Sequence, residues 1–365
     1  MAGSTYGTIF KITTWGESHG AGLGVVIDGC PAGIPLSAMD VQQFLDRRKP
    51  GQTRIATPRK EADEVEILSG IFEGYTTGTP ISMLVRNTSQ QSGDYSEIAS
   101  YYRPGHADFT FDSKYGFRDY RGGGRSSGRE TVGRVAAGAV ACIALKQLGI
   151  ELITYTKSIG NITINMDAFD TSAILETPTC MPDREASEKA ENYLEQCIKN
   201  SDSAGGIIEC IVKNMPAGIG DPVFEKLDAN LAKAVMSIGA VKAVEIGDGC
   251  AVSFSNGSFN NDAFCIEEQK ISKKTNHAGG ILGGISDGSD IILRAYVKPT
   301  PSIYSTQETV NKEKEEIKIN IKGRHDPIIV PRAVVVVEAM TAVTLFDALL
   351  LNMTARMDSI QKFYI

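Results

Sequence analysis

The chain has 365 residues, which is enough for one large domain or two ordinary ones, and its hydrophobic fraction of 42% is typical of a folded globular protein. Its formal net charge of −7 argues against a nucleic-acid-binding protein. Seven cysteines are dispersed between Cys30 and Cys265 without a Cys-x-x-Cys pair, a pattern that predicts reduced thiols in a reducing compartment and no metal site.

The N-terminal residues show no basic stretch followed by an apolar one, so we expect no secretory signal. We also expect no membrane-spanning segment. Residues 132–145 come nearest to the required length, and Arg134 interrupts them. Both expectations predict a cytoplasmic protein without a membrane partner.

Hydrophobic spacing and turn residues predict the elements of the first half of the chain. Strands are expected at residues 8–14, 23–28 and 80–86. A helix is expected at 36–48, because Ser37 can cap it and apolar side chains follow at helical spacing. Residues 49–64 are irregular, and 88–129 form a long polar stretch rich in glycine. Such a stretch is usually functional or disordered, and its arginines, aromatic residues and histidine favour a functional loop.

In the second half, helices and strands alternate without a clean linker. Helices are expected at residues 130–148, 182–199, 223–237 and 331–353, and strands at 206–213, 241–246 and 290–298. The first of these helices is rich in Ala and Val and is therefore expected to be buried, and Pro331 suits the first turn of the last one. We predict one α/β or α+β domain over residues 1–365.

Each of the four histidines lies in a glycine-rich or arginine-flanked segment. They are His19, His106, His277 and His325. Imidazole exchanges protons most readily near neutral pH, and a neighbouring glycine lets the backbone come close to a ligand. One such histidine alone would more often be structural, but four together favour proton transfer.

The densest candidate site is the segment RDYRGGGRSSGRET at residues 118–131. Three successive glycines allow close backbone approach, Ser126 and Ser127 supply hydroxyl groups, and the following helix offers unpaired N–H groups. With Arg125 and Arg129 this describes an anion-binding cradle, although its spacing matches neither a P-loop nor a dinucleotide fingerprint. A disordered Arg-Gly-Gly tract is the alternative, and the apolar helix that follows disfavours it.

A second basic cluster, at residues 47–60, includes Arg48 and Arg54. A solvated helix end would explain it equally well if it stood alone. Two arginine-rich loops in an acidic protein instead favour one concentrated site for phosphate or carboxylate groups.

Three further segments combine turn residues with chemically useful side chains. Arg103 precedes His106 in a Pro-Gly turn, residues 323–327 join a guanidinium, an imidazole and a carboxylate, and residues 298–302 leave a strand with exposed donors. The first two could equally be structural turns. There is no H-E-x-x-H motif. The residues alone thus predict an enzyme that binds a multiply anionic small molecule and uses histidine for proton transfer.

These segments, in this order, resemble the chorismate synthase family over nearly the whole chain. The matching signatures are residues 16–20, 48–51 with Arg54, 103–108, 120–131, 278–284, 298–302 and 323–327. The resemblance implies a β-α-β sandwich subunit, a homotetramer, and a lyase that eliminates phosphate from 5-enolpyruvylshikimate 3-phosphate in an anti 1,4 sense. The product would be chorismate, at the last common step of aromatic amino-acid biosynthesis.

The same resemblance implies a requirement for reduced FMN without net redox change, with NADPH acting only indirectly through flavin reduction. Relatives that reduce their own flavin are longer, so an external flavin reductase is expected as a partner.

The family's functional residues carry over by position. His19, helped by Ser18, would be the acid for the departing phosphate, His106 the proton donor to the reduced flavin, and Asp326 the group that assists deprotonation through flavin N5. Substrate anions, or a nicotinamide cofactor at the first two positions, would be bound by Arg48, Arg54, Arg103, Arg129 and Arg324. The flavin ligands would be Arg125, Ser126, Ser127, Gly239, Ala240, Gly283, Lys298, Pro299, Thr300, Pro301, Ser302 and Arg324.

Two positions depart from the family pattern. Gly128 replaces a usual Ala, and Gly239 replaces a bulkier residue or Asn, which puts a side-chain contact to the flavin in doubt. Two rival functions also remain at this stage. One is a flavin-dependent oxidoreductase acting on another phosphorylated carboxylate, which would consume NADPH in proportion to product. The other is an RNA-binding protein, which the acidic charge disfavours.

Overall fold

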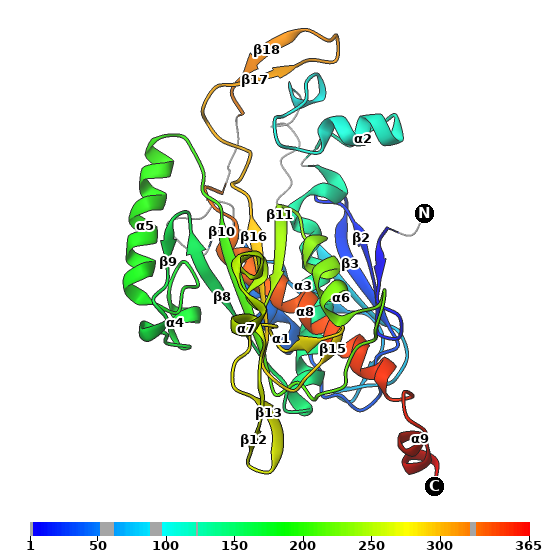
Figure 1. The fold of residues 1–365 in the computed structure, drawn as a ribbon. Coiled ribbons are helices and arrows are strands. Elements are labelled where there is room, and N and C mark those ends of the chain that lie inside the picture. Colours follow the sequence, from blue (N-terminus) through cyan, green and yellow to red (C-terminus); the bar gives the residue numbers. More distant parts are fainter. Residues whose placement is uncertain (1–2, 52–61, 88–96, 122, 322–325) are drawn as a thin grey trace.

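The computed structural model describes residues 3–51, 62–87, 97–121, 123–321 and 326–365. Two five-stranded antiparallel sheets form its framework (Figure 1). The first has the strand order β1-β2-β3-β7-β4. These strands span Thr5–Tyr6, Lys11–Gly16, Gly22–Asp28, Ile81–Arg86 and Val65–Ile67, respectively.

The second sheet has the strand order β11-β16-β10-β8-β9. Its strands span Val241–Ile246, Ile291–Val297, Gly206–Lys213, Glu151–Ile159 and Ile162–Thr163, respectively. In β16 every second residue is buried, among them Leu293 and Ala295, as expected for a strand that turns one face to a core.

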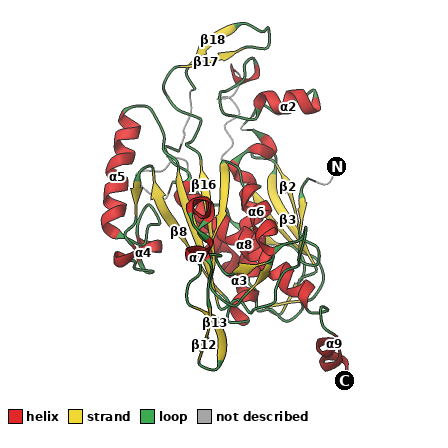
Figure 2. Ribbon diagram, viewed as in Figure 1, coloured by secondary structure: helices red, strands yellow, loops and turns green. Residues whose placement is uncertain are grey.

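A layer of helices lies between the sheets (Figure 2). They are α1 (Ala38–Arg48), α3 (Thr131–Gln147), α6 (Leu227–Met236) and α8 (Val330–Asn352). Helix α3 packs on β2, β3 and β7 of the first sheet, α8 packs on β8 and β10 of the second, and the two helices pack on each other. The predicted β-α-β sandwich is therefore confirmed.

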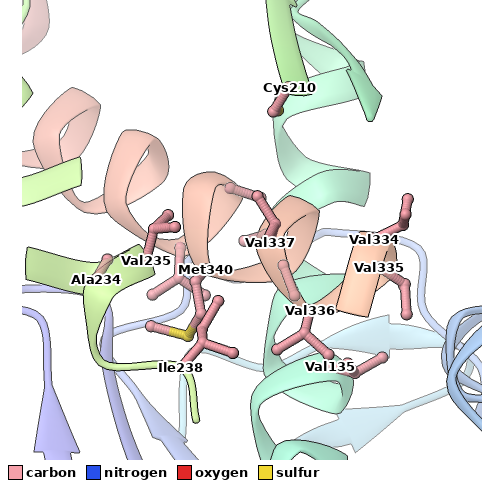
Figure 3. Packing of buried hydrophobic residues seen from close by; sticks show 14 of the residues in the cluster. Val135, Cys210, Ala234, Val235, Ile238, Val334, Val335, Val336, Val337 and Met340 are labelled. Atoms are coloured by element: carbon pink, nitrogen blue, oxygen red, sulfur yellow. The ribbon is translucent and has the colours of Figure 1, made fainter. Parts of the chain in front are cut away.

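The hydrophobic core runs through all three layers. Figure 3 shows the buried valines of α8, Val334 to Val337, beside Val135 of α3 and the end of α6. The crossing of α3 and α8 is close, because a Cβ added at Gly138 would lie 2.2 Å from the Cβ of Ala339. Gly138 is thus required by packing.

Helix α8 corrects one expectation from the sequence. By length and composition it is apolar enough to cross a membrane, so the expectation that residues 132–145 come nearest to the required length is wrong. In the structure, 78% of its most apolar window is buried. Its uniform apolarity follows from its place between two sheets and other helices, since a helix covered on all sides has no polar face.

Two buried carboxylates of α8 hold neighbouring segments by hydrogen bonds. Glu338 accepts hydrogen bonds of 3.0 and 2.6 Å from Arg47, which ties α1 to α8. Asp347 accepts the backbone N–H groups of Thr8, Ile9 and Phe10 at 2.9, 2.7 and 2.9 Å. Because these amides face a carboxylate, they cannot join a ladder, and the strand predicted from residue 8 begins only at Lys11.

The long stretch expected to be irregular contains helix α2 (Asp108–Tyr115), which the sequence analysis missed. Next to it lies the hairpin of β17 (Gln307–Val310) and β18 (Glu316–Ile319). A small separate core of Ile98, Tyr101, Ile319 and Ile321 joins the two segments. The structure therefore brings residues near 100 and near 320 together at one end of the molecule.

The remaining elements lie around the sandwich. They are β5 (Ile71–Phe72), β6 (Tyr75–Thr76), α4 (Ala173–Glu176), α5 (Arg184–Lys199), α7 (Gly257–Asn260), β12 (Phe264–Glu267), β13 (Lys270–Lys273), β14 (Ile281–Leu282), β15 (Ile285–Ser286) and α9 (Met357–Tyr364). The sequence analysis missed β8, a central strand. It also started α6 too early, because Val223 has a positive φ of 66° that a helix does not accommodate.

Candidate active site

A tight turn between β2 and β3 presents Ser18 and His19. The N–H of Gly20 donates to the carbonyl of Glu17 at 3.1 Å, which leaves Ser18 and His19 as the two central residues of the turn. The hydroxyl oxygen of Ser18 lies 3.2 Å from Nδ1 of His19. The same turn thus places a hydroxyl group beside an imidazole ring.

Arg48 and Arg129 meet on one buried carboxylate, that of Asp63. Nη2 of Arg48 donates to one oxygen of Asp63 at 3.0 Å, and Nη1 of Arg129 donates to the other at 2.7 Å. The Asp63 side chain has no exposed surface, whereas that of Arg129 is 11% exposed. Asp63 therefore binds the two guanidinium groups on their buried side. Its φ of 47° is unusual for a residue with a side chain.

Arg48 keeps its charge despite deep burial. Burial lowers its pKa, Asp63 opposes that shift, and the resulting pKa is about 10. Nη1 of Arg48 also approaches the Gly128 carbonyl at 3.4 Å and Thr131 Oγ1 at 3.3 Å. Its buried Nε has no hydrogen-bond partner among the described residues. The arginine pair therefore carries one positive charge more than its carboxylate neutralises, which suits an anionic ligand.

Asn87 and Arg332 connect this pair to other predicted site residues. Asn87 accepts from Nε of Arg129 at 2.7 Å and donates to the Glu17 and Gly20 carbonyls at 2.9 and 2.8 Å. Arg332 donates to the carbonyl of Arg48 at 3.0 Å and forms an ion pair with Asp326. Asp326 thus lies close to the arginine pair.

A second group of residues forms around the turn at 103–106. Arg103 donates twice to Asp108, from Nε and Nη2, at 2.8 Å each, and Arg118 makes an ion pair of 2.8 Å with the same carboxylate. Burial alone would raise the pKa of Asp108, but the hydrogen bonds and charge of Arg103 lower it to about 2. Arg103, predicted to bind substrate, is therefore anchored to Asp108.

His106 is held as a neutral imidazole. Nδ1 lies 2.9 Å from the Pro104 carbonyl, which can only accept, so Nδ1 carries the proton. Nε2, at 2.8 Å from Ser302 Oγ, then accepts from that hydroxyl. Burial and the charge of Arg103 lower the pKa of His106 to about 4. To act as a proton donor near neutral pH, His106 requires a bound anion that raises this pKa.

The segment at 298–302 packs directly on the turn that carries His106. Lys298 Nζ donates to the Gly105 carbonyl at 2.8 Å, and a Cβ at Gly105 would lie 2.7 Å from Pro301. The buried hydroxyl of Thr300 has no hydrogen-bond partner among the described residues. The backbone N–H of Lys298 donates to Ala240 at 2.9 Å, so the predicted flavin residues 240 and 298–302 lie together.

The glycine-rich segment lies against the first turn. Arg125 donates to the carbonyls of Gly16 and Thr14 at 3.2 and 3.1 Å. Ser126 donates to the Gly123 carbonyl at 2.7 Å, and Ser127 accepts the N–H of Arg129 at 3.3 Å. These side chains shape the start of α3. They therefore set the position of Arg129 in addition to any contact with a ligand.

The two groups are linked through residues 118 and 119. Arg118 pairs with Asp108 in the second group. Its neighbour Asp119 has a lowered pKa, mainly because Arg121 donates hydrogen bonds to it, and His19 of the first group adds to the lowering. The charge of His19 thus acts on Asp119, the neighbour of Arg118.

The other residues singled out from the sequence divide into four cases. Gly283, with φ of 62°, sits in the turn of the β14–β15 hairpin, where its conformation accounts for glycine. A Cβ at Gly128 or Gly239 would meet nothing within 4 Å, so the family's larger residues would fit there.

Arg54 and Arg324 lie outside the described residues, as does His325. Nδ1 of His277 lies 2.6 Å from a carboxylate oxygen of Asp248, which belongs to neither group.

Sequence reasoning missed Asp63, Asn87, Asp108 as an anchor, and Arg332. Asn87 follows a buried strand directly, and a polar residue at a strand end is a weak signal of a site. Nothing in the sequence pairs Asp63 with Arg129, since the two are far apart in the chain.

The family model described as chorismate synthase matches residues 10–350. The chorismate synthase of Agathobacter rectalis is 66% identical over 364 residues, covering 100% of this chain and 99% of that protein. The chorismate synthase of Methanocella arvoryzae is 55% identical over 353 residues, covering 96% and 95%. A crystal structure of chorismate synthase matches with a TM-score of 0.77 at 30% identity, covering 98% of this chain and 97% of that one.

Proposed function

This chain belongs to the chorismate synthase family of lyases, and we propose that it converts 5-enolpyruvylshikimate 3-phosphate to chorismate. The proposed reaction is an anti 1,4-elimination of phosphate that requires reduced FMN and has no net redox change. The observation that supports it most is the buried arginine pair, Arg48 and Arg129, beside the turn that presents His19. An anion site next to a proton donor is what phosphate loss needs.

We propose that the arginine pair binds an anionic group of the substrate, with Arg54 and Arg324 as further ligands. The substrate carries a phosphate and two carboxylates, so it needs several guanidinium groups. Planar guanidinium groups suit these anions, and burial strengthens the interaction because water does not screen it. Arg103 contributes through its charge and through its fixed position on Asp108.

His19 protonates the departing phosphate in this proposal. Ser18, at 3.2 Å from Nδ1, orients its ring. Loss of phosphate leaves negative charge on oxygen, and a proton from an imidazole at that point lowers the barrier. Asp326, paired with Arg332 next to Arg48, is the proposed group that assists removal of the substrate proton.

The residues of the second group fit a flavin. Lys298 supplies a cation, and the hydroxyl of Thr300 is buried without a partner among the described residues. We propose that this segment, with Arg125, Ser126, Ser127, Ala240, and the turns at Gly239 and Gly283, holds reduced FMN. When bound, reduced FMN supplies electron density for the elimination. His106 would carry the proton at Nε2, where Ser302 now donates.

Assembly and partners follow the family. We propose a homotetramer, an external flavin reductase that uses NADPH, and a cytoplasmic location. Exposed apolar side chains on the β12–β13 hairpin support association between copies: Phe264 is 63% exposed, Ile266 72% and Ile271 76%. Apolar groups gathered in this way commonly mark an interface.

The test is phosphate release from 5-enolpyruvylshikimate 3-phosphate under anaerobic conditions. We expect turnover with dithionite-reduced FMN and none with oxidised FMN. Equal turnover without reduced flavin would end the flavin part of the proposal. NADPH consumption in step with product would favour the oxidoreductase instead.

A further inference from the structure

Asn87, the residue that follows β7, contacts two parts of the candidate site with one side chain. Its Oδ1 accepts from Nε of Arg129 at 2.7 Å. Its Nδ2 donates to the carbonyl of Glu17 at 2.9 Å and to that of Gly20 at 2.8 Å. All three distances are those of good hydrogen bonds, so every polar atom of this carboxamide contacts a neighbour.

The orientation of this carboxamide is determined by its partners. An arginine Nε–H can only donate, so the amide oxygen must face Arg129. Backbone carbonyls can only accept, so the amide nitrogen must face Glu17 and Gly20. Neither an aspartate nor a leucine of the same shape could satisfy all three groups.

The two carbonyls are the ends of the turn that presents Ser18 and His19. Within that turn the N–H of Gly20 already donates to the Glu17 carbonyl. The Asn87 side chain therefore spans the turn from its first to its fourth residue. The backbone N–H of Asn87 adds a third bond, to the carbonyl of Ala21 at 3.2 Å, so strand end and turn are joined at three points.

On its other side Asn87 reaches the arginine pair. Arg129 is held by Asn87 at Nε and by Asp63 at Nη1, which fixes the guanidinium plane. Asp63 in turn holds Arg48. One continuous set of hydrogen bonds thus runs from Arg48 through Asp63, Arg129 and Asn87 to the His19 turn.

We propose that Asn87 is a positioning residue that sets the His19 turn relative to the arginine pair. It keeps the proposed proton donor at a constant distance from the anion that Arg48 and Arg129 bind. The inference rests on the proposed function for its kinetic consequence, because that function requires a proton to reach the leaving phosphate. The position of the His19 turn relative to the arginine pair, by contrast, does not depend on which substrate binds.

The informative variant is Asn87→Asp. It keeps the acceptor for Arg129 but places a second acceptor against the two carbonyls, so it releases the turn and retains the arginine. Misplacing a catalytic group by about 1 Å can cost about a hundredfold in rate. We therefore expect kcat at saturating substrate to fall about ten- to a hundredfold. KM should rise as well, because the new carboxylate offsets the excess positive charge of the arginine pair.

Asn214→Asp is the matched control. Asn214 also donates its amide to a backbone carbonyl, that of Gly149 at 3.1 Å, and it lies outside the site. We expect its kcat to equal that of the parent. Asn87→Ala, which adds no charge, should lower kcat as well and also raise KM, because Arg129 loses a partner. If both Asn87 variants turn over within about threefold of the parent per folded protein, the positioning role is wrong.

A second readout separates this inference from the proposed function. Inorganic phosphate is titrated into protein with 13C-labelled histidine rings, and His19→Gln identifies the His19 signal. In the parent, we expect phosphate to shift that signal. In Asn87→Ala, which adds no charge, the shift at saturating phosphate should shrink at least about threefold. If the parent released no phosphate from the substrate, but its His19 signal still shifted with phosphate more than that of the variant, only the proposed function would be wrong. An equal shift in parent and variant would overturn the positioning role.

Discussion

At the scale of single residues, His106 connects folding to pH. Its pKa is about 4 in the folded protein, whereas an exposed imidazole titrates near 6.5. Between these values the unfolded chain binds a proton that the folded protein does not. Stability therefore falls as the pH drops from about 6.5 to about 4, and this group accounts for about 3 kcal/mol of that loss.

Urea unfolding at pH 7 and pH 5 measures this effect. His106→Gln keeps an amide that can bond Pro104 or Ser302 but cannot titrate. We expect the variant to lose less stability than the parent between the two pH values. Carboxylates titrate in both proteins, so the difference isolates His106. Parallel pH dependence in the two proteins would contradict the pKa assigned from the structure.

Asp63 is a second residue with a measurable role of its own. Removing one partner of a buried ion pair leaves the other charge uncompensated, which typically costs about 3–5 kcal/mol. Asp63 serves two arginines, so we expect Asp63→Asn to lose at least that amount in urea unfolding. The exposed pair of Arg86 and Glu66 provides the comparison, because water screens it and Glu66→Gln should cost much less than Asp63→Asn. Equal losses of unfolding free energy in the two variants would show that Asp63 does not compensate two buried arginines.

Arg129 tests the anion site directly. A charge-assisted hydrogen bond to a buried anion contributes roughly 1.5–3 kcal/mol. We expect Arg129→Ala to weaken substrate binding about tenfold to a hundredfold and to leave FMN binding within about threefold, as measured by calorimetry. Unchanged substrate affinity would place the anion site elsewhere.

At the scale of elements, the crossing of α3 and α8 depends on Gly138. In an isolated helix, Ala is favoured over Gly by about 1 kcal/mol. Here an added Cβ would lie 2.2 Å from the Cβ and 2.5 Å from the Cα of Ala339, so the helices would have to separate. Because overpacking of this kind costs more than the propensity gains, we expect Gly138→Ala to lose about 2 kcal/mol or more.

Gly257 is the control for this prediction. It begins α7, and a Cβ there would meet nothing within 4 Å. Gly257→Ala should leave the free energy of unfolding unchanged or slightly raised. If both alanine variants behaved alike, the α3–α8 contact would not be as close as the structure has it.

Elements were predictable where local signals agreed. The Ser37 cap with its helix, the alanine- and valine-rich α3, and strands β10 and β11 follow from spacing and capping alone. Helix α2 was missed because its sequence DFTFDSKY has no clear apolar face. The start of β2 was misplaced because Asp347, more than 330 residues away, binds the amides of residues 8–10. Long-range partners of this kind leave no local trace.

The same limit applies to the site. Its segments were recognisable, because glycine, arginine, serine and histidine cluster in them. The partners that hold those residues were not, since Asp63 and Asn87 lie in ordinary surroundings in the sequence. Their roles depend on the sheet order that brings β3, β7 and β4 side by side.

At the scale of the whole molecule, the sandwich leaves a hairpin projecting from the body of the protein. Strands β12 and β13 extend from it in Figure 1, and they carry Phe264, Ile266 and Ile271, each more than 60% exposed. A lone exposed apolar side chain needs no partner, but three on one hairpin expose enough apolar surface to favour association. We expect this hairpin to lie in an interface between copies of the chain.

The double variant Ile266→Asp with Ile271→Asp tests this expectation. Placing two carboxylates in an apolar interface opposes association, because each charge would have to be buried without a partner. Light scattering coupled to size-exclusion chromatography should therefore give a smaller assembly for the variant than for the parent. Leu175→Asp is the control, since Leu175 of α4 is a 72% exposed apolar side chain outside the hairpin, and the variant should keep the parent's mass. A variant that keeps the parent's mass would place the interface on another surface.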